Sequence, residues 1–415
     1  MYSIATQKGQ KVQVRDVSLG QGVELNTLPP FLGISEPIKG RGKMGKLSVE
    51  EIRKLAEKVA REKLAPRASE IDQNRSFPWE NICELRKAGF FGVGTQEFDR
   101  VRFATVVKEV AKACASTALV YVSHSIVERA IENASSETVK KKWPLEILRE
   151  RGLGAFAVHE PDSGCNSAAI TTRAIKDNET YLVNGSKFFI TSAGEADIYM
   201  VLVRTDPEKG PQGMSTLLIE KEAPGLSFGR PENKMGLTST SSREMFFNDC
   251  RVPFENLLGK EGEGIQVLGK TVMGWGFFGA AAISVGIAQA ATDLSIKHAK
   301  ERKIAGQPIG AHQAVQFMIT DMILGSEAAE ALLMGCAARA DSSPDTAAIN
   351  GFKAKLYASE MAVDVTNKAI QVHGGHGYCR EYTVERLFRD ARGLMLHFKT
   401  SEGLRQDIAK VSLEL

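Results

Sequence analysis

The stretch of sequence that decides the fold is QVHGGHGYCREYTVERLFRDAR, residues 371–392, near the C-terminal end of the chain. It places a glycine pair, Gly374 and Gly375, directly after one helical pattern and ahead of another. Adjacent glycines at a helix end let a ligand or another backbone approach closely. Taken alone, such a segment is more often a turn than a binding site, so its meaning depends on the other segments of the chain.

The composition is that of an ordinary globular protein of 415 residues, with 43% apolar and 25% charged residues. The net charge is +3, and the basic residues are spread along the chain, so nothing indicates a nucleic-acid partner. Six cysteines are scattered without a CxxC pair, which argues against a disulfide framework and favours a cytoplasmic location. The N-terminus lacks an apolar signal segment, and we expect no apolar run long enough to span a membrane.

Changes of hydrophobic period divide the chain into segments. Residues 1–44, rich in Gly, Lys and Gln, are expected to form an N-terminal extension with a little strand around KVQVRDV. Apolar positions then recur at intervals of three and four residues, which predicts an N-terminal helical domain over 45–154. Ser48 and Glu51 have the spacing of a capping box at the start of its first helix.

The middle of the chain has a different period. Runs such as DIYMVLVRTD and MSTLLIEKE predict a β-domain over 155–257. Within it, the pair Asn184-Gly185 is predicted to form a tight hairpin turn, because Asn-Gly adopts positive φ at little cost. The helical period returns over 258–415, where long helical patterns predict a C-terminal bundle domain.

Several kinds of chemistry find no support in the sequence. There is no GxSxG motif for serine hydrolysis, and HGGHGY follows a helix, which excludes a Rossmann fingerprint. His373, His376 and His397 lie close in sequence but not at a ligand spacing, so no metal site is expected. The other chemically dense stretch is HEPDSGCNS, residues 159–167, whose short polar side chains and backbone N–H groups can hold an anion such as phosphate.

Five blocks in this order resemble those of the acyl-CoA dehydrogenase family. HEPDSGCNS resembles the family's TEPxxGSD loop, and NGSKFFIT (184–191) resembles its NGxKxWIT hairpin. VPFENLLGKEGEG (252–264), ERKIAGQPIGAHQAVQ (301–316) and residues 371–392 match further blocks. The resemblance covers most of the chain. It implies an α+β fold with an N-terminal helical domain, a central β-domain and a C-terminal four-helix bundle, assembled as a homotetramer or homodimer.

The resemblance also implies FAD, bound between the β-domain and the C-terminal bundle and completed by a neighbouring subunit. Thr191 matches a residue near the flavin N5. Arg302 matches one that meets the pyrophosphate across the dimer, where a planar guanidinium suits paired phosphates. Such a cofactor supplies hydride chemistry, while the protein supplies position and electrostatics. The residues that match cofactor-binding positions are Phe156, Val158, His159, Gly164, Cys165, Phe189, Thr191, Arg302, His312, Gln371, Gly374, Gly375, Thr400 and Glu402.

At some of these positions the chain departs from the family pattern. His159 stands in place of the Thr of TEP, and Cys165 and Asn166 replace the Ser and Asp of GSD. Phe189 replaces the Trp that packs on the flavin and keeps an aromatic face. Each change weakens a contact without abolishing the site.

The largest departure concerns the catalytic base. The family's glutamate, shortly after RDAR, removes the α-proton of an acyl thioester while the β-hydrogen leaves as hydride to the flavin. RDARGLMLHFKTSE (389–402) puts Phe398 at that position and His397 beside it. The alternative base position of other members falls near Gly276, again without an acid. A positioned base contributes roughly 10²–10⁴-fold to rate, so its loss is not a small change.

Three interpretations stay open. In the first, dehydrogenation persists with His159 or His397 as base, since histidine titrates near neutrality. In the second, no α-proton is abstracted, as in elimination or decarboxylation of an acyl thioester or in flavin monooxygenation. In the third, the protein binds FAD without catalysis, as a scaffold or electron-carrier partner. VMGWGFFGA (272–280) mixes small and aromatic residues, which favours a shaped acyl pocket and therefore an enzyme.

We therefore expect an FAD-dependent oxidoreductase that acts on an acyl thioester, with α,β-dehydrogenation as the default reaction. The expected partners are an acyl-CoA or acyl-carrier-protein substrate, with an electron-transfer flavoprotein or oxygen as the electron acceptor. No nucleic acid and no membrane is expected among them.

Overall fold

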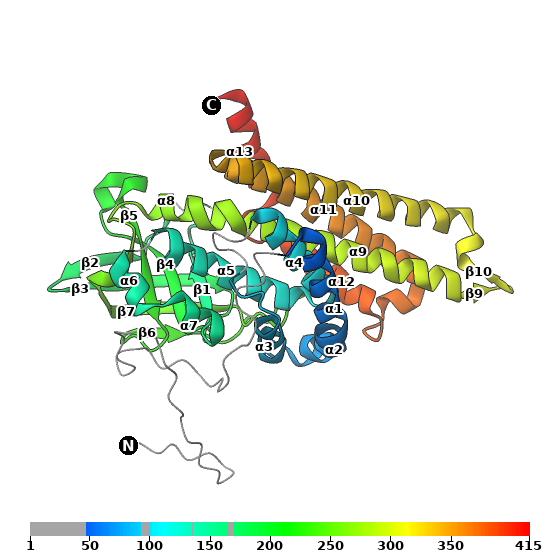
Figure 1. The fold of residues 1–415 in the computed structure, drawn as a ribbon, viewed down its shortest axis with the longest axis horizontal. Helices are drawn as coiled ribbons and strands as arrows, with labels where there is room; N and C mark the ends of the chain where they lie inside the picture. Colours follow the sequence, from blue (N-terminus) through cyan, green and yellow to red (C-terminus); the bar gives the residue numbers. More distant parts are fainter. Residues whose placement is uncertain (1–46, 93–98, 135, 165, 167–168) are drawn as a thin grey trace, which may run out of the picture. The chain divides into compact units, whose positions relative to one another are not determined.

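The computed structural model describes residues 47–415, except 93–98, 135, 165 and 167–168. The predicted extension over 1–44 lies outside these residues. Along the described chain, helices come first, strands second and helices last, which confirms the predicted α+β fold (Figure 1). The exact domain boundaries stay predictions.

The N-terminal helices start at the predicted cap. The Oγ of Ser48 accepts a hydrogen bond from the N–H of Glu51 at 3.2 Å, and the Glu51 carboxylate accepts one from the N–H of Ser48 at 2.8 Å. This reciprocal pair satisfies two backbone donors that the first turn would otherwise leave free. The helices are α1 (Val49–Val59), the π-helical turn η3 (Ala60–Leu64), α2 (Ala65–Asn74), α3 (Trp79–Lys87), α4 (Arg100–Ala113), α5 (Ala115–Ala134), α6 (Glu137–Lys142) and α7 (Leu145–Glu150).

An eight-stranded sheet follows, with strand order β6-β7-β3-β2-β4-β5-β8 and β1 paired parallel to β4. The central strands β4 and β5 are buried on both faces along almost their whole length, as their apolar sequences predict. The strands are β1 (Gly154–Ala157), β2 (Arg173–Asp177), β3 (Thr180–Ile190), β4 (Ile198–Arg204), β5 (Met214–Glu220), β6 (Leu226–Phe228), β7 (Arg243–Pro253) and β8 (Leu257–Leu258).

The prediction of a hairpin turn at Asn184-Gly185 is wrong. Strand β3 runs through both residues, and the turn lies at 178–179, where Asn178 takes the positive φ of 52°. Gly185 instead marks a bulge in the pairing of β3 with β7, with a φ of 143°. A Cβ there would lie 2.7 Å from the Cα of Thr172, so the glycine serves close backbone approach, not a turn.

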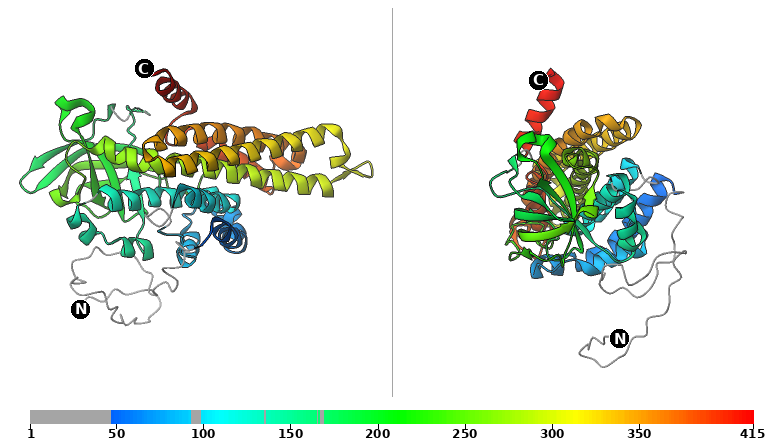
Figure 2. Two further views of the ribbon diagram at one scale, coloured as in Figure 1. Left: turned by 45° about the horizontal axis from the view of Figure 1, so that its top comes forward. Right: turned by 90° about the vertical axis from the view of Figure 1, so that its left-hand side faces the viewer.

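Four helices, α9 (Phe277–Glu301), α10 (Gln313–Ser342), α11 (Ala347–His373) and α12 (Thr383–Leu394), form the predicted C-terminal bundle, and Figure 2 shows the long ones packed lengthwise. α9 and α11 run in the same direction, because Phe277 packs on Phe352 near their starts and Ala299 packs on Val372 near their ends. The short β9 (Lys303–Ile304) and β10 (Gln307–Pro308) form the tip, which points away from the sheet (Figure 1).

Shorter elements complete this part of the chain. α8 (Gly264–Leu268) and the π-helical η7 (Gly269–Gly276) lead into α9, and α13 (Ser401–Leu413) follows the bundle. The 3-10 turns are η5 (Pro207–Gly213), η6 (Phe254–Asn256), η8 (Ile309–Ala311), η9 (Pro344–Thr346) and η10 (Gly374–Tyr378).

The expectation that no apolar run has the length of a membrane span is wrong at one place. The helical stretch Gly264–Glu301 is long and apolar enough to cross a membrane, judged by length and composition alone. It is a core helix, since 94% of its most apolar window is buried inside the fold. Burial on all sides explains why its sequence shows no polar face.

Arg389 and Asp390, the RD of RDAR, join the three parts of the chain. Arg389 of α12 forms an ion pair with Asp72 of α2 at 2.6 Å and donates to the Met235 carbonyl at 3.0 Å. Asp390 accepts a hydrogen bond from the N–H of Leu237 at 2.6 Å. One turn of α12 is thereby tied to an N-terminal helix and to the loop that precedes β7.

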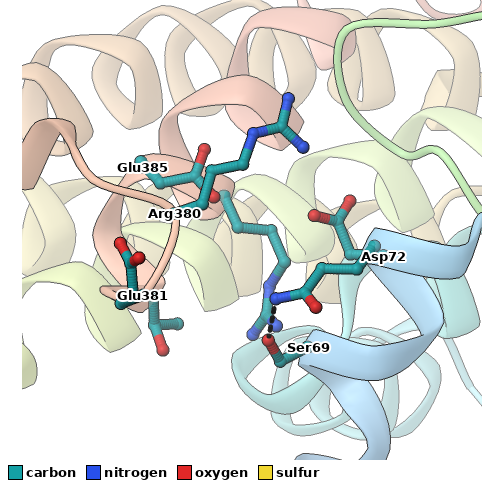
Figure 3. A pocket seen from close by; sticks show the side chains of 8 residues that line it. Ser69, Asp72, Arg380, Glu381 and Glu385 are labelled. Carbon is teal, nitrogen blue, oxygen red and sulfur yellow. Dashed lines mark hydrogen bonds between the residues drawn. The ribbon is translucent and has the colours of Figure 1, made fainter.

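A small polar pocket opens beside this ion pair. Figure 3 shows Ser69 and Asp72 projecting from α2 toward the segment that carries Arg380, Glu381 and Glu385. Two arginines and three carboxylates line it, so side chains of both charges face the pocket. Its full lining is Ser69, Asp72, Gln73, Arg380, Glu381, Thr383, Glu385 and Arg386.

We predict that Asp72→Ala lowers the free energy of unfolding by about 2 kcal/mol, because it leaves the half-buried Arg389 without its partner across the domain junction. Chemical denaturation monitored by circular dichroism measures this change. Glu360→Ala is the matched control, because Glu360 pairs with Arg405 at 2.6 Å on the surface, where ion pairs contribute little. Equal stability losses in the two variants would contradict the role of the junction.

Candidate active site at the domain junction

The turn that follows α12 carries Phe398 in an unusual backbone conformation. Its φ is 62°, in the left-handed region that non-glycine residues avoid. Such a conformation persists only when the surroundings impose it. Here the fully buried Lys355 of α11 does so, because its ammonium donates to the carbonyls of Met395 and Lys399 at 3.1 and 2.7 Å.

The Phe398 ring lies among aromatic residues and glycine. It is stacked on Phe156 of β1, with centroids 5.8 Å apart and an angle of 16°, and it packs on Phe277 of α9 at 5.6 Å. A Cβ on Gly276 would lie 2.7 Å from the Cε1 of Phe398. The two positions that the sequence comparison marked for a base therefore touch each other, and neither is acidic.

Helix α5 packs against Gly276 and Gly279 from another side. A Cβ on Gly276 would also lie 3.1 Å from the Cδ1 of Ile126, and one on Gly279 would lie 2.6 Å from a methyl of Val122. Both glycines are therefore required by close packing. The glycines of VMGWGFFGA therefore lie directly against Phe398 and against Ile126 and Val122 of α5.

His159 lies directly after β1 and reaches the same turn. Its carbonyl accepts a hydrogen bond from the N–H of Phe188 at 2.9 Å, and its imidazole lies near the Phe398 backbone, which favours the protonated form. Burial lowers the pKa of His159, and the positive charge of Lys187 lowers it further, against the opposing effect of the Phe398 backbone. The side chain is therefore neutral at neutral pH.

His397 is held more tightly. Its Nδ1 lies 3.0 Å from the carbonyl of Gly393, so this nitrogen carries the proton and donates. Burial, with the nearby ammonium groups of Lys234 and Lys355, lowers the pKa of His397 to about 4. His159 also lowers the pKa of His397, so the two candidate bases lie close together.

A buried ion pair supports the loop that begins at His159. Lys187 of β3 lies 2.8 Å from Glu160 and donates to the Val158 carbonyl at 3.1 Å. Burial alone would raise the pKa of Glu160, but Lys187 and the donors of Thr171 and Thr172 lower it to about 2. The E of HEP and the K of NGSK thus bind the loop to the sheet.

The end of β3 presents an aromatic ring to solvent. Phe189 has a φ of 54°, and 51% of its surface is exposed. The pairing of β3 with β7 is irregular between Lys187 and Ile190, which turns the ring out of the sheet. Thr191 follows, and Ser192 has a buried Oγ without a hydrogen-bond partner among the described residues. An exposed aromatic face beside short hydroxyl side chains suits a planar, polar ring system.

A second group of predicted cofactor residues lies at the far end of the bundle. Arg302 ends α9 beside the tip, His312 precedes α10, and Gln371, Gly374 and Gly375 lie at the end of α11. α9 has 25 residues, so this end is about 37 Å from the Phe277 end. One chain does not bring the two groups together.

The remaining predicted residues have mixed outcomes. Val158 contributes its carbonyl to Lys187, and Phe156 stacks on Phe398. Thr400 caps α13, since its Oγ1 accepts a hydrogen bond from the N–H of Gly403 at 3.3 Å, and Glu402 in the first turn is exposed. Cys165 lies outside the described residues.

Sequence reasoning missed Lys355. The signal was present, because Lys355 occupies an apolar position of α11 in line with Ala358 and Ala362. A lone lysine in the buried stripe of a helix needs internal acceptors. Here they are the carbonyls of the turn that carries Phe398.

Comparison with known proteins identifies the family. Residues 48–151, 155–250 and 262–413 match the models of the acyl-CoA dehydrogenase N-terminal, middle and C-terminal domains. The chain belongs to the acyl-CoA dehydrogenase family.

Individual relatives match over most of their length. The acryloyl-CoA reductase (NADH) of Anaerotignum propionicum is 38% identical over 361 residues, which cover 85% of this chain and 91% of that protein. The structure of butyryl-CoA dehydrogenase from Megasphaera elsdenii has a TM-score of 0.84 at 33% identity and covers 88% of this chain and 99% of its own. The PigA protein solved with FAD and proline has a TM-score of 0.83 at 26% identity, covering 89% and 99%.

The residues present fit a dinucleotide of the kind bound in this family. A Cβ built on Gly164, Gly374 or Gly375 meets no atom of the described residues within 4 Å, which leaves room for a ligand beside each backbone. Phe189 supplies the aromatic face, and Arg302 is an exposed guanidinium. These two groups of residues lie at opposite ends of the bundle.

Proposed function

We propose that this member of the acyl-CoA dehydrogenase family is an FAD-dependent oxidoreductase that acts on the α,β-carbons of an acyl thioester. The observation that carries the proposal is the juxtaposition of His159, Phe398 and the exposed Phe189 at one domain junction. The N–H of Phe188, next to Phe189, donates to the His159 carbonyl, and the Phe398 backbone lies close enough to the His159 imidazole to affect its pKa. A planar cofactor on Phe189 would thus lie beside the residues that replace the usual base.

When bound, FAD would supply the hydride chemistry. The chain's own residues would position the thioester and handle its α-proton. Phe156, Phe277 and Phe398 exclude water from the place of the missing carboxylate. An apolar surrounding of this kind strengthens electrostatic interactions but provides no proton acceptor of its own.

We infer that His159, and not His397, is the proton acceptor. The Nδ1 of His397 is occupied by Gly393, and a group with a pKa of about 4 is a weak base at neutral pH. Burial lowers the pKa of His159 from its ordinary value, which keeps the imidazole neutral at neutral pH. His159 therefore combines a neutral imidazole with a place beside the candidate flavin face.

A second function has its own supporting observation. The contact of Phe398 with Gly276 makes both base positions apolar, which suits a reaction that begins without α-proton abstraction. Elimination or decarboxylation of an acyl thioester, and flavin monooxygenation, meet that condition.

We propose a homodimer or homotetramer, because Arg302, Gln371 and the Gly374–Gly375 pair of one subunit would complete the FAD site of another. The relatives' names support an acyl-CoA substrate, with an acyl-carrier thioester as the alternative, and an electron-transfer flavoprotein as the electron acceptor. A cytoplasmic location fits the free cysteines among the described residues, and cell fractionation tests it.

The first experiment is an anaerobic titration of the purified yellow protein with a panel of acyl-CoA thioesters, following the oxidised-flavin band. Bleaching by one thioester is the expected result and identifies a substrate. A spectral shift without bleaching would favour the second function, and no response to any thioester would contradict both. Light scattering on the same sample should give a mass of at least twice 45.2 kDa. A monomer that retains FAD would overturn the shared site.

We predict that His159→Ala abolishes flavin reduction by the thioester while FAD stays bound. In the unsubstituted protein, the rate should hold through neutral pH and fall only on the acid side of 6.5. The reason is that the pKa of His159 is lowered from that value and the base must be neutral to act. Stopped-flow reduction across a pH series measures both effects. Reduction that survives in His159→Ala would remove this residue from the mechanism.

A further inference from the structure

The conformation of Phe398 is maintained against its own preference. A left-handed backbone costs an aromatic residue roughly 1–2 kcal/mol relative to the ordinary regions, and glycine would avoid that cost. Yet this position carries a large ring, and the hydrogen bonds of Lys355 and the Gly393–His397 hydrogen bond hold the turn in place. Strain that the surroundings impose so thoroughly indicates that the placement of the ring matters.

The Phe398 ring packs tightly against the start of α9 and the residue before it, Gly276. The edge of Phe398 faces Gly276, where even a methyl group would come within 2.7 Å of it. Further along α9, Gly279 packs on Val122 of α5 equally closely. Phe156 covers one face of the ring, and Phe277 packs against it from α9. Phe398 and α5 therefore both pack tightly against residues 276–279.

We propose that Phe398 is a specificity-determining residue that restricts the substrate to thioesters of short, compact acyl groups. This rests on the proposed function, because it assumes that an acyl thioester binds at the His159–Phe398 junction. The chain's replacement of a carboxylate by phenylalanine then has two consequences. It removes a proton acceptor, and it fills the volume that a longer acyl chain would need.

The test compares the binding of butanoyl-CoA and octanoyl-CoA through the shift each causes in the flavin band of the holoenzyme. We expect octanoyl-CoA to bind at least about tenfold more weakly, since a few methylene groups without space produce discrimination of that order. Phe398→Ala should reverse the preference. Phe398→Gly, which suits the left-handed backbone, repeats the test with less risk to folding. Phe352→Ala is the matched control, because it shortens another ring packed on Phe277 and leaves Phe398 in place.

Gly276→Ala tests the same contact in the opposite way, because it adds atoms beside the Phe398 ring where Phe398→Ala removes them. Its methyl group would displace the Phe398 ring, so butanoyl-CoA should bind more weakly in Gly276→Ala but normally in the double variant Gly276→Ala/Phe398→Ala. Equal binding of the two thioesters in the unsubstituted protein, or an unchanged preference in Phe398→Ala and Phe398→Gly that retain FAD, would overturn the inference. Failure of every thioester to perturb the flavin would instead contradict the proposed function.

Discussion

The ion pair between Arg389 and Asp72 is the contact on which the geometry of the candidate site depends. It joins α12 to the N-terminal helices, while the neighbouring Asp390 holds the backbone of Leu237 in the loop before β7. Burial opposes ionisation of Asp72, but hydrogen bonds from Arg389 and Thr238 outweigh it and lower the pKa of Asp72. Because α12 leads directly into the turn at 395–399, this junction determines where Phe398 meets β1 and η7.

The electrostatics of the junction come from lysines. Lys187, Lys234 and Lys355 are all buried or nearly so, and burial lowers the pKa of Lys187 and of Lys234 to about 8. Each lies close enough to a histidine of the site to disfavour its protonation. A site of this kind keeps His159 and His397 neutral at neutral pH, where a carboxylate would have been charged. The junction therefore replaces an acidic base with neutral imidazoles beside an apolar ring.

Much of this could be predicted from the sequence, because the signals were local. The capping box at Ser48, the order of helical and β-rich segments and the motif blocks need only spacing and residue type. Asn184-Gly185 misled because a turn and a bulge use the same backbone conformations, and only the neighbouring Thr172 distinguishes them. The substitution by Phe398 was visible in the sequence. Its contact with Gly276 was not, because more than a hundred residues separate the two positions in the chain.

The central claim is that Phe398 occupies the place of the missing base, and Phe398→Glu tests it most directly. A carboxylate there would lie among Phe156, Phe277 and Gly276, an apolar setting that raises its pKa toward neutrality and suits a general base. The measurement is the rate of anaerobic flavin reduction by a short acyl-CoA in the variant and in the unsubstituted protein. An increase of about 10²-fold or more is predicted. An unchanged or slower rate in a folded, FAD-loaded variant would contradict the assignment of that position.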